Sequence, residues 1–358
     1  MDLFFVRHPA RILINVLLAV FPTVFATVSC SKGPEEEEGA LAFVVQNVGE
    51  TRASLVNDTA TMKTKYGSIG FGLLGYQFEG LWNDNLTANF AYNDKCTESS
   101  GIWRTSGAYM LPGNSSRLRF FAYAPYNGNG ITLPATNAQG VPVIQYTLPT
   151  NLSDQKDLLV SDTGSVPGGG LDTYHLTFEH PLTAVMFEVA SDSATGTVKG
   201  ITISGLYGSG SLPLDAAYWH PATNPWTPTG NRTVSYTATM NYAHTHDGGD
   251  TSLHEDPDND IFLIIPQTLP VPVNPGDPCA KITVSFAAGA STIARNYERN
   301  IGGSFPWGRM LKLRLFIDPF LAEGENITWE TFIASGETLT WIPYTGLDGT
   351  AQGSNMVP

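Results

Sequence analysis

The chain has 358 residues, too many for one ordinary hydrophobic core, and carries a formal net charge of -14. Affinity for nucleic acid comes largely from cations that neutralise phosphates, so 19 Lys and Arg against 33 Asp and Glu exclude nucleic acid as a partner. Only 15% of residues are charged while 42% are hydrophobic, a composition typical of all-β proteins whose polar surface is made of hydroxyls and amides.

The first 29 residues predict a lipoprotein signal peptide. Arg7 and Arg11 form a positive amino-terminal region, and the apolar run 12–26 is too short to span a bilayer comfortably. A small residue precedes Cys30, whose thiol is the predicted site of lipidation. Each buried methylene of an acyl chain contributes about 0.8 kcal/mol to anchoring, so several chains on Cys30 would hold the protein at a membrane. The alternative interpretation is a permanent membrane anchor helix.

An acidic spacer follows the cysteine. Four consecutive glutamates occupy residues 35–38, and such a run is either a solvated linker or, directly after a lipidated cysteine, a segment that resembles a lipoprotein surface-export signal. We assign residues 30–52 to this spacer and to the strand that comes next.

The first predicted strand covers residues 40–48. Leu41, Phe43 and Val45 share one face of it, so the strand is expected to be buried on at least that face. The polar stretch 49–54 then predicts a loop that exposes Arg52 to a trypsin-like protease.

The remainder predicts a series of strands separated by turns about every ten residues, the pattern of β-sandwiches. The apolar or alternating segments lie at residues 66–76, 82–92, 117–125, 174–178, 180–189, 198–206, 233–242, 261–267, 281–286, 310–317, 326–334 and 338–344. A polar turn near residue 192 divides an N-terminal sandwich, 53–192, from a C-terminal one, 193–358. The only helix-like segment is 214–219, and the chain ends in a Gly- and Asn-rich tail.

Few residues indicate chemistry. His244 and His246 alternate as on a strand, which would let them share a metal ion, but they lie in a Gly- and Asp-rich segment that also reads as a solvated loop. Cys96 and Cys279 are expected to be free buried thiols. No nucleophile motif such as G-x-S-x-G is present, so we expect no enzyme activity, no catalytic residues and no cofactor.

Six short motifs occur in an order that resembles the fimbrillin-like family, the pilins of Bacteroidales type V pili. The motifs are Trp103 with residues 109–112 (YMLP), 120–126 (FFAYAPY), 156–159 (KDLL), 176–182 (LTFEHPL), 264–269 (IIPQTL) and 307–308 (WG). Together they cover most of the mature chain.

The resemblance implies a lipoprotein precursor with two transthyretin-like β-sandwiches, carried to the outer membrane and cell surface. An arginine-specific protease would cut between Arg52 and Ala53 and so remove the first strand. A strand from another pilin subunit would fill the vacated groove, and Leu339, Trp341 and Ile342 mark the expected donor strand.

A second hypothesis is a surface lipoprotein or pilus-tip adhesin that binds glycans. Its basis is a set of tryptophans expected to be exposed, since aromatic rings are common platforms for sugars: Trp82, Trp103, Trp219 and Trp226. Stalk, tip and accessory roles remain open at this point.

Overall fold

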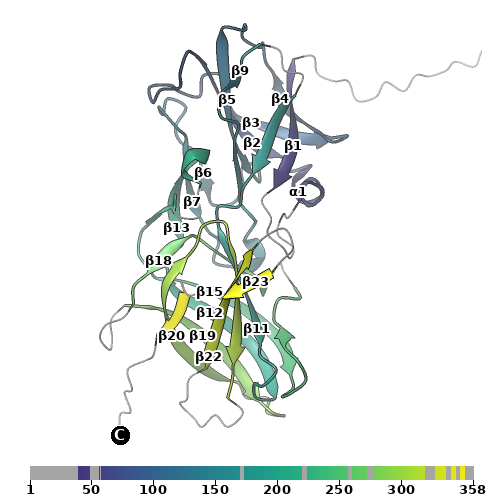
Figure 1. Cartoon of the computed structure of the whole chain (residues 1–358), viewed down its shortest axis with the longest axis vertical. Coiled ribbons are helices and arrows are strands. Elements are labelled where there is room, and N and C mark those ends of the chain that lie inside the picture. The colour runs from purple at the N-terminus through teal and green to yellow at the C-terminus, as the bar shows by residue number, and fades with distance from the viewer. Residues whose placement is uncertain are drawn as a thin grey trace, which may run out of the picture. The chain divides into compact units, whose positions relative to one another are not determined.

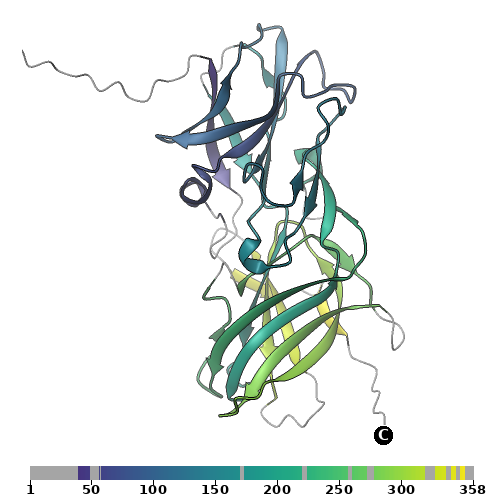
Figure 2. The ribbon, with the colours of Figure 1, turned by 180° about the vertical axis from the view of Figure 1, so that it is seen from behind.

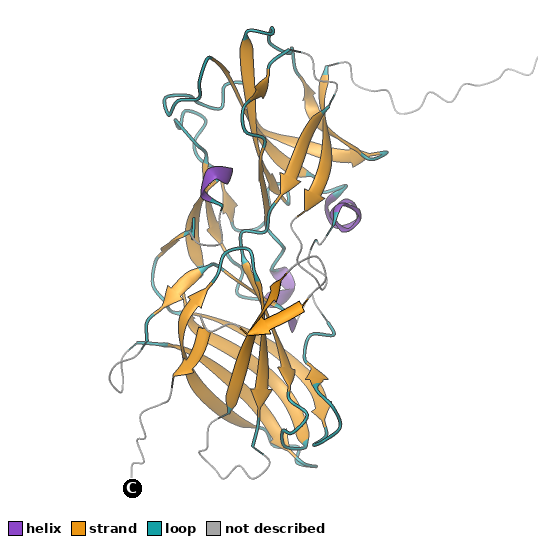
Figure 3. Cartoon of the chain, viewed as in Figure 1, coloured by secondary structure: helices purple, strands orange, loops and turns teal. Residues whose placement is uncertain are grey.

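Strands and the turns between them make up nearly all of the structure, which confirms the all-β prediction (Figure 3). The computed structural model describes residues 39–48, 56, 58–169, 173–219, 224–256, 260–271, 278–318, 327–335, 340–343 and 347–350. Its short helical segments include α1 (Thr59–Tyr66), η1 (Leu152–Asp154) and η2 (Ala216–Tyr218).

The N-terminal half forms one eight-stranded sheet of order β10-β1-β4-β3-β2-β5-β8, with β9 paired to β5 (Figure 1). Its strands are β1 (Ala40–Val48), β2 (Phe71–Glu79), β3 (Ala91–Ser99), β4 (Ile102–Ala108), β5 (Ser116–Ala124), β8 (Leu159–Asp162), β9 (Val166–Pro167) and β10 (Tyr174–Phe178). The two ends of the sheet meet, because Val160 and Glu179 exchange main-chain hydrogen bonds of 3.0 and 2.8 Å. The sheet therefore encloses its own core.

Phe43 of β1 lies at the centre of that core and is fully buried. Its ring centroid is 6.0 Å from Phe71, 5.3 Å from Phe120 and 5.6 Å from Tyr174, which belong to β2, β5 and β10. Aromatic pairs at such distances add to the stabilisation that comes from area burial. One side chain of β1 thus contacts three other strands of the same sheet.

The C-terminal half forms a sandwich of two six-stranded sheets. One has the order β16-β11-β21-β22-β23 with β17 on β11, and the other the order β15-β12-β19-β20-β18 with β24 on β20. Figure 2 shows the long strands of the second sheet side by side. The first comprises β11 (Thr183–Val189), β16 (Thr251–Ser252), β17 (Phe262–Ile264), β21 (Met310–Phe316), β22 (Thr328–Ser335) and β23 (Thr340–Pro343). The second comprises β12 (Gly196–Leu206), β15 (Val234–His244), β18 (Gln267–Leu269), β19 (Ala280–Ala288), β20 (Arg295–Phe305) and β24 (Leu347–Thr350).

A four-stranded sheet of order β14-β13-β7-β6 contains strands from both halves of the chain. Its strands are β6 (Ile131–Thr132), β7 (Val143–Thr147), β13 (Ser209–Pro213) and β14 (Thr227–Thr229). β7 and β13 pair antiparallel over five residue pairs, from Ser209 opposite Thr147 to Pro213 opposite Val143. Residues on either side of the turn near 192 therefore share main-chain hydrogen bonding.

β19, at the place of the strand predicted at 281–286, has one buried and one solvent-facing side. Ile282, Val284 and Phe286 are buried, while the alternating residues Lys281, Thr283 and Ser285 are half-exposed. Strand side chains alternate between the two faces of a sheet, so this pattern places the apolar set in the sandwich core.

The helix α1 was not predicted, and 214–219 is not the only helical segment. The Asp58 carboxylate caps α1 by accepting a hydrogen bond of 2.6 Å from the Thr61 amide. Only Met62 and Tyr66 are buried on it. The signal was hidden because two apolar residues in one short helix give little periodicity.

Two predicted boundaries are also wrong. Residues 82–90 contain turns instead of the expected strand, and β3 begins at Ala91. The tail contains β24, which pairs with β20 and buries Leu347 completely. A four-residue strand with one apolar anchor is stabilised by its partner strand, so its own composition does not reveal it.

We expect Phe43→Ala to destabilise the chain by about 3–5 kcal/mol, the usual cost of deleting a buried aromatic ring. Urea unfolding would measure the loss. Gln46→Ala on the same strand is the control, since Gln46 is exposed and such changes stay within about 0.5 kcal/mol. Equal unfolding midpoints for the two variants would contradict the central role of Phe43.

Candidate functional site

The first strand, β1, is bonded along both edges. It pairs parallel with β10, where Phe43 lies opposite Tyr174, and antiparallel with β4, where Phe43 lies opposite Trp103. Its bounds, Ala40–Val48, match the strand expected at 40–48. Without β1, β10 and β4 would each present an unpaired edge across a strand-wide gap.

The side chains expected on one face of β1 divide into two groups. Leu41 and Phe43 are buried, at 3% and 0% exposure, whereas Val45 is only half-buried. A register irregularity between Val45 and Asn47 ends the regular alternation, and Val48 is buried again. The Leu41 amide also donates a hydrogen bond of 2.9 Å to the Thr105 hydroxyl of β4.

The chain is held again at Val56, eight positions beyond Val48. Val56 is fully buried, and its amide donates a hydrogen bond of 2.9 Å to Oδ2 of Asp157. The predicted cleavage residues Arg52 and Ala53 are in the stretch 49–55, which lies outside the described residues. This stretch therefore joins two buried anchors, Val48 and Val56.

Asp157 is a buried carboxylate with partners from three segments. Besides the Val56 amide, it lies 3.1 Å from Nδ1 of His180 through Oδ1, and its main-chain carbonyl accepts a 2.7 Å hydrogen bond from the Tyr66 hydroxyl. A buried carboxylate needs such partners, because desolvation without them is costly. His180 is accordingly a buried residue whose side chain serves the interior of the fold.

Sequence reasoning assigned no role to Asp157, although it stands in the motif at 156–159. The available signal was one acidic residue directly before the apolar pair Leu158 and Leu159, both of which are buried. An acid in such a position is either at the surface or paired inside, and only the fold supplies the partners.

The expected donor segment forms β23, which pairs antiparallel with β22. Trp341 lies opposite Ala334 and Ile342 opposite Ile333 in this ladder. Leu339 lies outside the described residues.

The predicted lipidation site Cys30 and the glutamate run 35–38 also lie outside the described residues. Within the described ranges, no helix has the length and apolarity needed to cross a bilayer.

The two histidines proposed for a metal have separate partners. His244 is 2% exposed, with Nδ1 2.7 Å from the Thr251 hydroxyl, and its Nε2 has no partner among the described residues. His246 directs Nδ1 to the carbonyls of Asp192 and Ser193, each at 3.1 Å. The described part of the chain contains no group of three His, Cys, Asp or Glu residues placed to hold a metal ion.

The expected platform of exposed tryptophans is not formed. Trp103 and Trp226 are 3% and 4% exposed, and Trp82 and Trp219 are half-buried. Trp226 donates its indole N–H to the Pro181 carbonyl at 2.6 Å, and Trp219 stacks on Trp307. These rings stabilise the core, so they give the glycan hypothesis no support.

Cys96 and Cys279, the cysteines within the described residues, are both free thiols. Cys96 is buried, and burial raises the pKa of its thiol well above the usual value. Cys279 is only half-buried, which differs from the expectation that both are fully inside.

Comparisons with known proteins show which proteins this chain resembles in sequence and in fold. A family described as fimbrillin-like matches residues 51–304. Fimbrium subunit Fim1C of Phocaeicola vulgatus is 32% identical over 183 residues, which are 45% of this chain and 47% of that protein. The match thus spans about half the length of this curated relative. The crystal structure of a fimbrial protein from Bacteroides vulgatus has the same fold, with a TM-score of 0.58, 21% identity, and coverage of 82% of this chain and 98% of that one.

His244 makes stability depend on pH. Burial lowers the pKa of its imidazole below the usual value of 6.5. As the pH falls below 6.5, the unfolded chain therefore binds a proton at His244 while the folded chain does not. Stability should therefore fall with decreasing pH until the folded-state pKa is reached. Urea midpoints at pH 5 to 8 would measure this.

The control is His244→Gln, which cannot titrate. The difference in midpoint between parent and variant should be constant above pH 7 and should narrow as pH falls. A difference that does not change with pH would contradict the assignment.

Proposed function

The chain belongs to the fimbrillin-like family, and from this premise we propose that it is a structural subunit of a cell-surface fimbria that polymerises by donor-strand exchange. In this proposal an arginine-specific protease cuts after Arg52, β1 leaves the N-terminal sheet, and a strand of another subunit takes its place between β10 and β4. The partners are other pilin subunits.

One observation carries the proposal: an interior strand is connected to the rest of the chain through a short stretch that contains an arginine. β1 pairs on both sides, and its connection, residues 49–55, runs between the buried residues Val48 and Val56. A cut after Arg52 would separate β1 from the chain without removing Val56 or its hydrogen bond to Asp157. The groove would therefore keep its shape next to the new N-terminus.

Energetics explain why the cut must be followed by exchange. Burying a side chain such as Leu41, Phe43 or Val48 stabilises by roughly 1.5–3 kcal/mol, so the three together approach the stability of a whole domain, about 5–15 kcal/mol. A cleaved β1 would stay bound until a strand with comparable apolar residues replaced it. Strand addition supplies both the main-chain hydrogen bonds and the apolar side chains that the groove requires.

The order of the segments couples release from the membrane to activation of the groove. Cys30, with its proposed lipid, precedes β1, so one cut after Arg52 separates the mature chain from both the lipid and the strand. Before that cut, the lipid would hold the precursor at the outer membrane and β1 would keep the apolar groove covered.

Replacing Arg52 tests the cleavage step. Arg52→Ala and the charge-preserving Arg52→Lys should both leave a full-length, lipidated chain that does not enter fibres, because an arginine-specific protease recognises neither residue. Mass spectrometry of isolated fibres measures incorporation and should find the parent N-terminus at Ala53. Thr51→Ala is the control and should assemble normally. Fibres of normal amount from Arg52→Ala would sink the proposal.

Replacing Trp341 tests the donor strand. Trp341→Asp places a charge where an apolar side chain would enter the groove, so the subunit should be cut after Arg52 yet remain unpolymerised. Gel filtration and electron microscopy would show the loss of fibres, and a thermal midpoint within a few degrees of the parent would show that the fold persists.

Thr340→Ser in the same strand is the matched control and should polymerise. If Trp341→Asp enters fibres as well as the control does, the donor strand lies elsewhere in the chain.

A further inference from the structure

β15 is a long strand with an open edge. It ends the order of its sheet, and within the described residues it pairs only with β12. Its eleven residues, VSYTATMNYAH, contain no Lys, Arg, Asp, Glu or Pro. Natural proteins usually block a free edge with charges, prolines or short strands, because unpaired N–H and C=O groups invite another strand. The irregularity in β15 that could hinder a further strand is a bulge opposite residues 198–200. The pairing with β12 is regular from Ser235 to Thr239.

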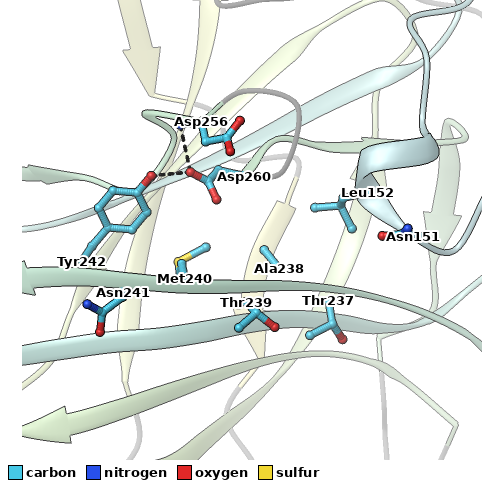
Figure 4. A pocket seen from close by; sticks show the side chains of 10 residues that line it. All are labelled: Asn151, Leu152, Thr237, Ala238, Thr239, Met240, Asn241, Tyr242, Asp256 and Asp260. Carbon is cyan, nitrogen blue, oxygen red and sulfur yellow. Dashed lines mark hydrogen bonds between the residues drawn. The ribbon is translucent and has the colours of Figure 1, made fainter.

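A cavity of about 400 Å³ runs along this edge (Figure 4). Six consecutive residues of β15, 237–242, line it, together with Asn151 and Leu152 toward one end and with Asp256 and Asp260 next to Tyr242 toward the other. Successive strand residues point to opposite faces of a sheet. A cavity that touches all six therefore follows the main chain at the strand edge instead of lying on one face.

Two polar side chains of this stretch, Thr237 and Asn241, are engaged with the neighbouring strand. The hydroxyl of Thr237 lies 2.9 Å from that of Thr202, and the side-chain oxygen of Asn241 accepts a hydrogen bond from the Lys199 ammonium; Thr202 and Lys199 both belong to β12. What β15 offers to the cavity is chiefly its main chain. Main-chain groups in a row suit an extended peptide, whereas recognition of a sugar needs side chains that point into the pocket.

Negative charge lies at one end of the cavity. The Tyr242 hydroxyl and the Asp256 amide, the latter at 3.0 Å, both donate to Oδ2 of Asp260. Burial, followed by the hydrogen bond to Asp260, raises the pKa of Tyr242 to about 12, so the phenol remains a donor.

The charges of Asp256 and Asp260 favour a basic peptide over a second copy of this chain as the occupant of the edge. A second copy of the chain would bring a further formal charge of -14 and its own pair of aspartates to this edge, which disfavours pairing of β15 with itself. A lysine or arginine side chain next to Asp256 and Asp260 would be attracted, because charge-assisted hydrogen bonds to carboxylates are among the stronger ones.

We propose that the outer edge of β15 is a strand-addition site for an extended peptide that carries a basic side chain toward Asp256 and Asp260. The peptide pairs with residues 235–242 through main-chain hydrogen bonds, and its cationic residue lies at the Tyr242 end. The site is separate from β1 and does not depend on cleavage after Arg52.

The test uses the full-length chain and a synthetic probe, the blocked peptide Thr-Val-Thr-Lys-Thr-Val-Thr with a fluorescent label. Fluorescence anisotropy should detect saturable binding, and hydrogen exchange should show protection within residues 234–244 and none in β19. Two isomers of the probe, N-methylated on alternate residues, each lack the amide donors of one edge. One isomer should bind about tenfold more weakly or worse, and the other should bind like the parent.

Charge is tested in the same assay. Asp256→Asn should weaken binding several-fold, and Glu298→Gln, which removes an exposed carboxylate from β20 of the same sheet, should leave it unchanged. A probe with Glu in place of Lys should not bind.

Several results would overturn the proposal. They are the absence of binding at millimolar probe, equal binding of both N-methylated isomers, and protection that maps outside β15. Protection of β15 by an oligosaccharide instead of the probe, or by a dimer that forms without it, would assign the edge to a different occupant.

Discussion

The double pairing of β1 is the constraint on which the N-terminal sheet depends. This strand is hydrogen-bonded to β10 on one side and to β4 on the other. The two ends of the sheet also meet, between Val160 and Glu179, so β1 connects β10 to the rest of the closed sheet. Phe43 of β1 also contacts aromatic rings of β2, β5 and β10. Because a sheet cannot keep its unpaired edges and an empty core at low cost, any route that removes β1 must supply a replacement.

Asp157 gives the region beyond β1 a fixed point that does not rely on β1. Its carboxylate accepts a hydrogen bond from the Val56 amide and contacts His180, and its main-chain carbonyl accepts a hydrogen bond from the Tyr66 hydroxyl. These partners come from widely separated parts of the chain, and each hydrogen bond offsets part of the desolvation of a buried acid. The start of the proposed mature chain is thus held by polar contacts in the interior, while β1 is held by pairing and apolar burial.

The strand edges of the two halves differ in what lies against them. In the N-terminal sheet the edges of β10 and β4 are covered by β1, whose apolar side chains complete the core. In the C-terminal sandwich the outer edge of β15 borders a polar cavity with two aspartates at one end. In the first case apolar side chains of the covering strand complete the core, whereas in the second the edge presents main-chain groups and negative charge, the features on which the proposed peptide site rests.

The sequence by itself determined the all-β class and the elements whose side chains follow a clear local pattern. The apolar run of β1 and the alternation of Ile282, Val284 and Phe286 in β19 predicted strands at the observed places, since period-two burial is a property of consecutive residues. Only the tertiary structure decided which neighbours those strands have, that Trp103 and Trp226 are buried, that Leu347 anchors β24, and that Asp157 meets Val56. These features depend on segments far apart along the chain, Val56 and Asp157 being 101 positions apart. Pairing and burial at such separations leave no periodic mark in the local sequence.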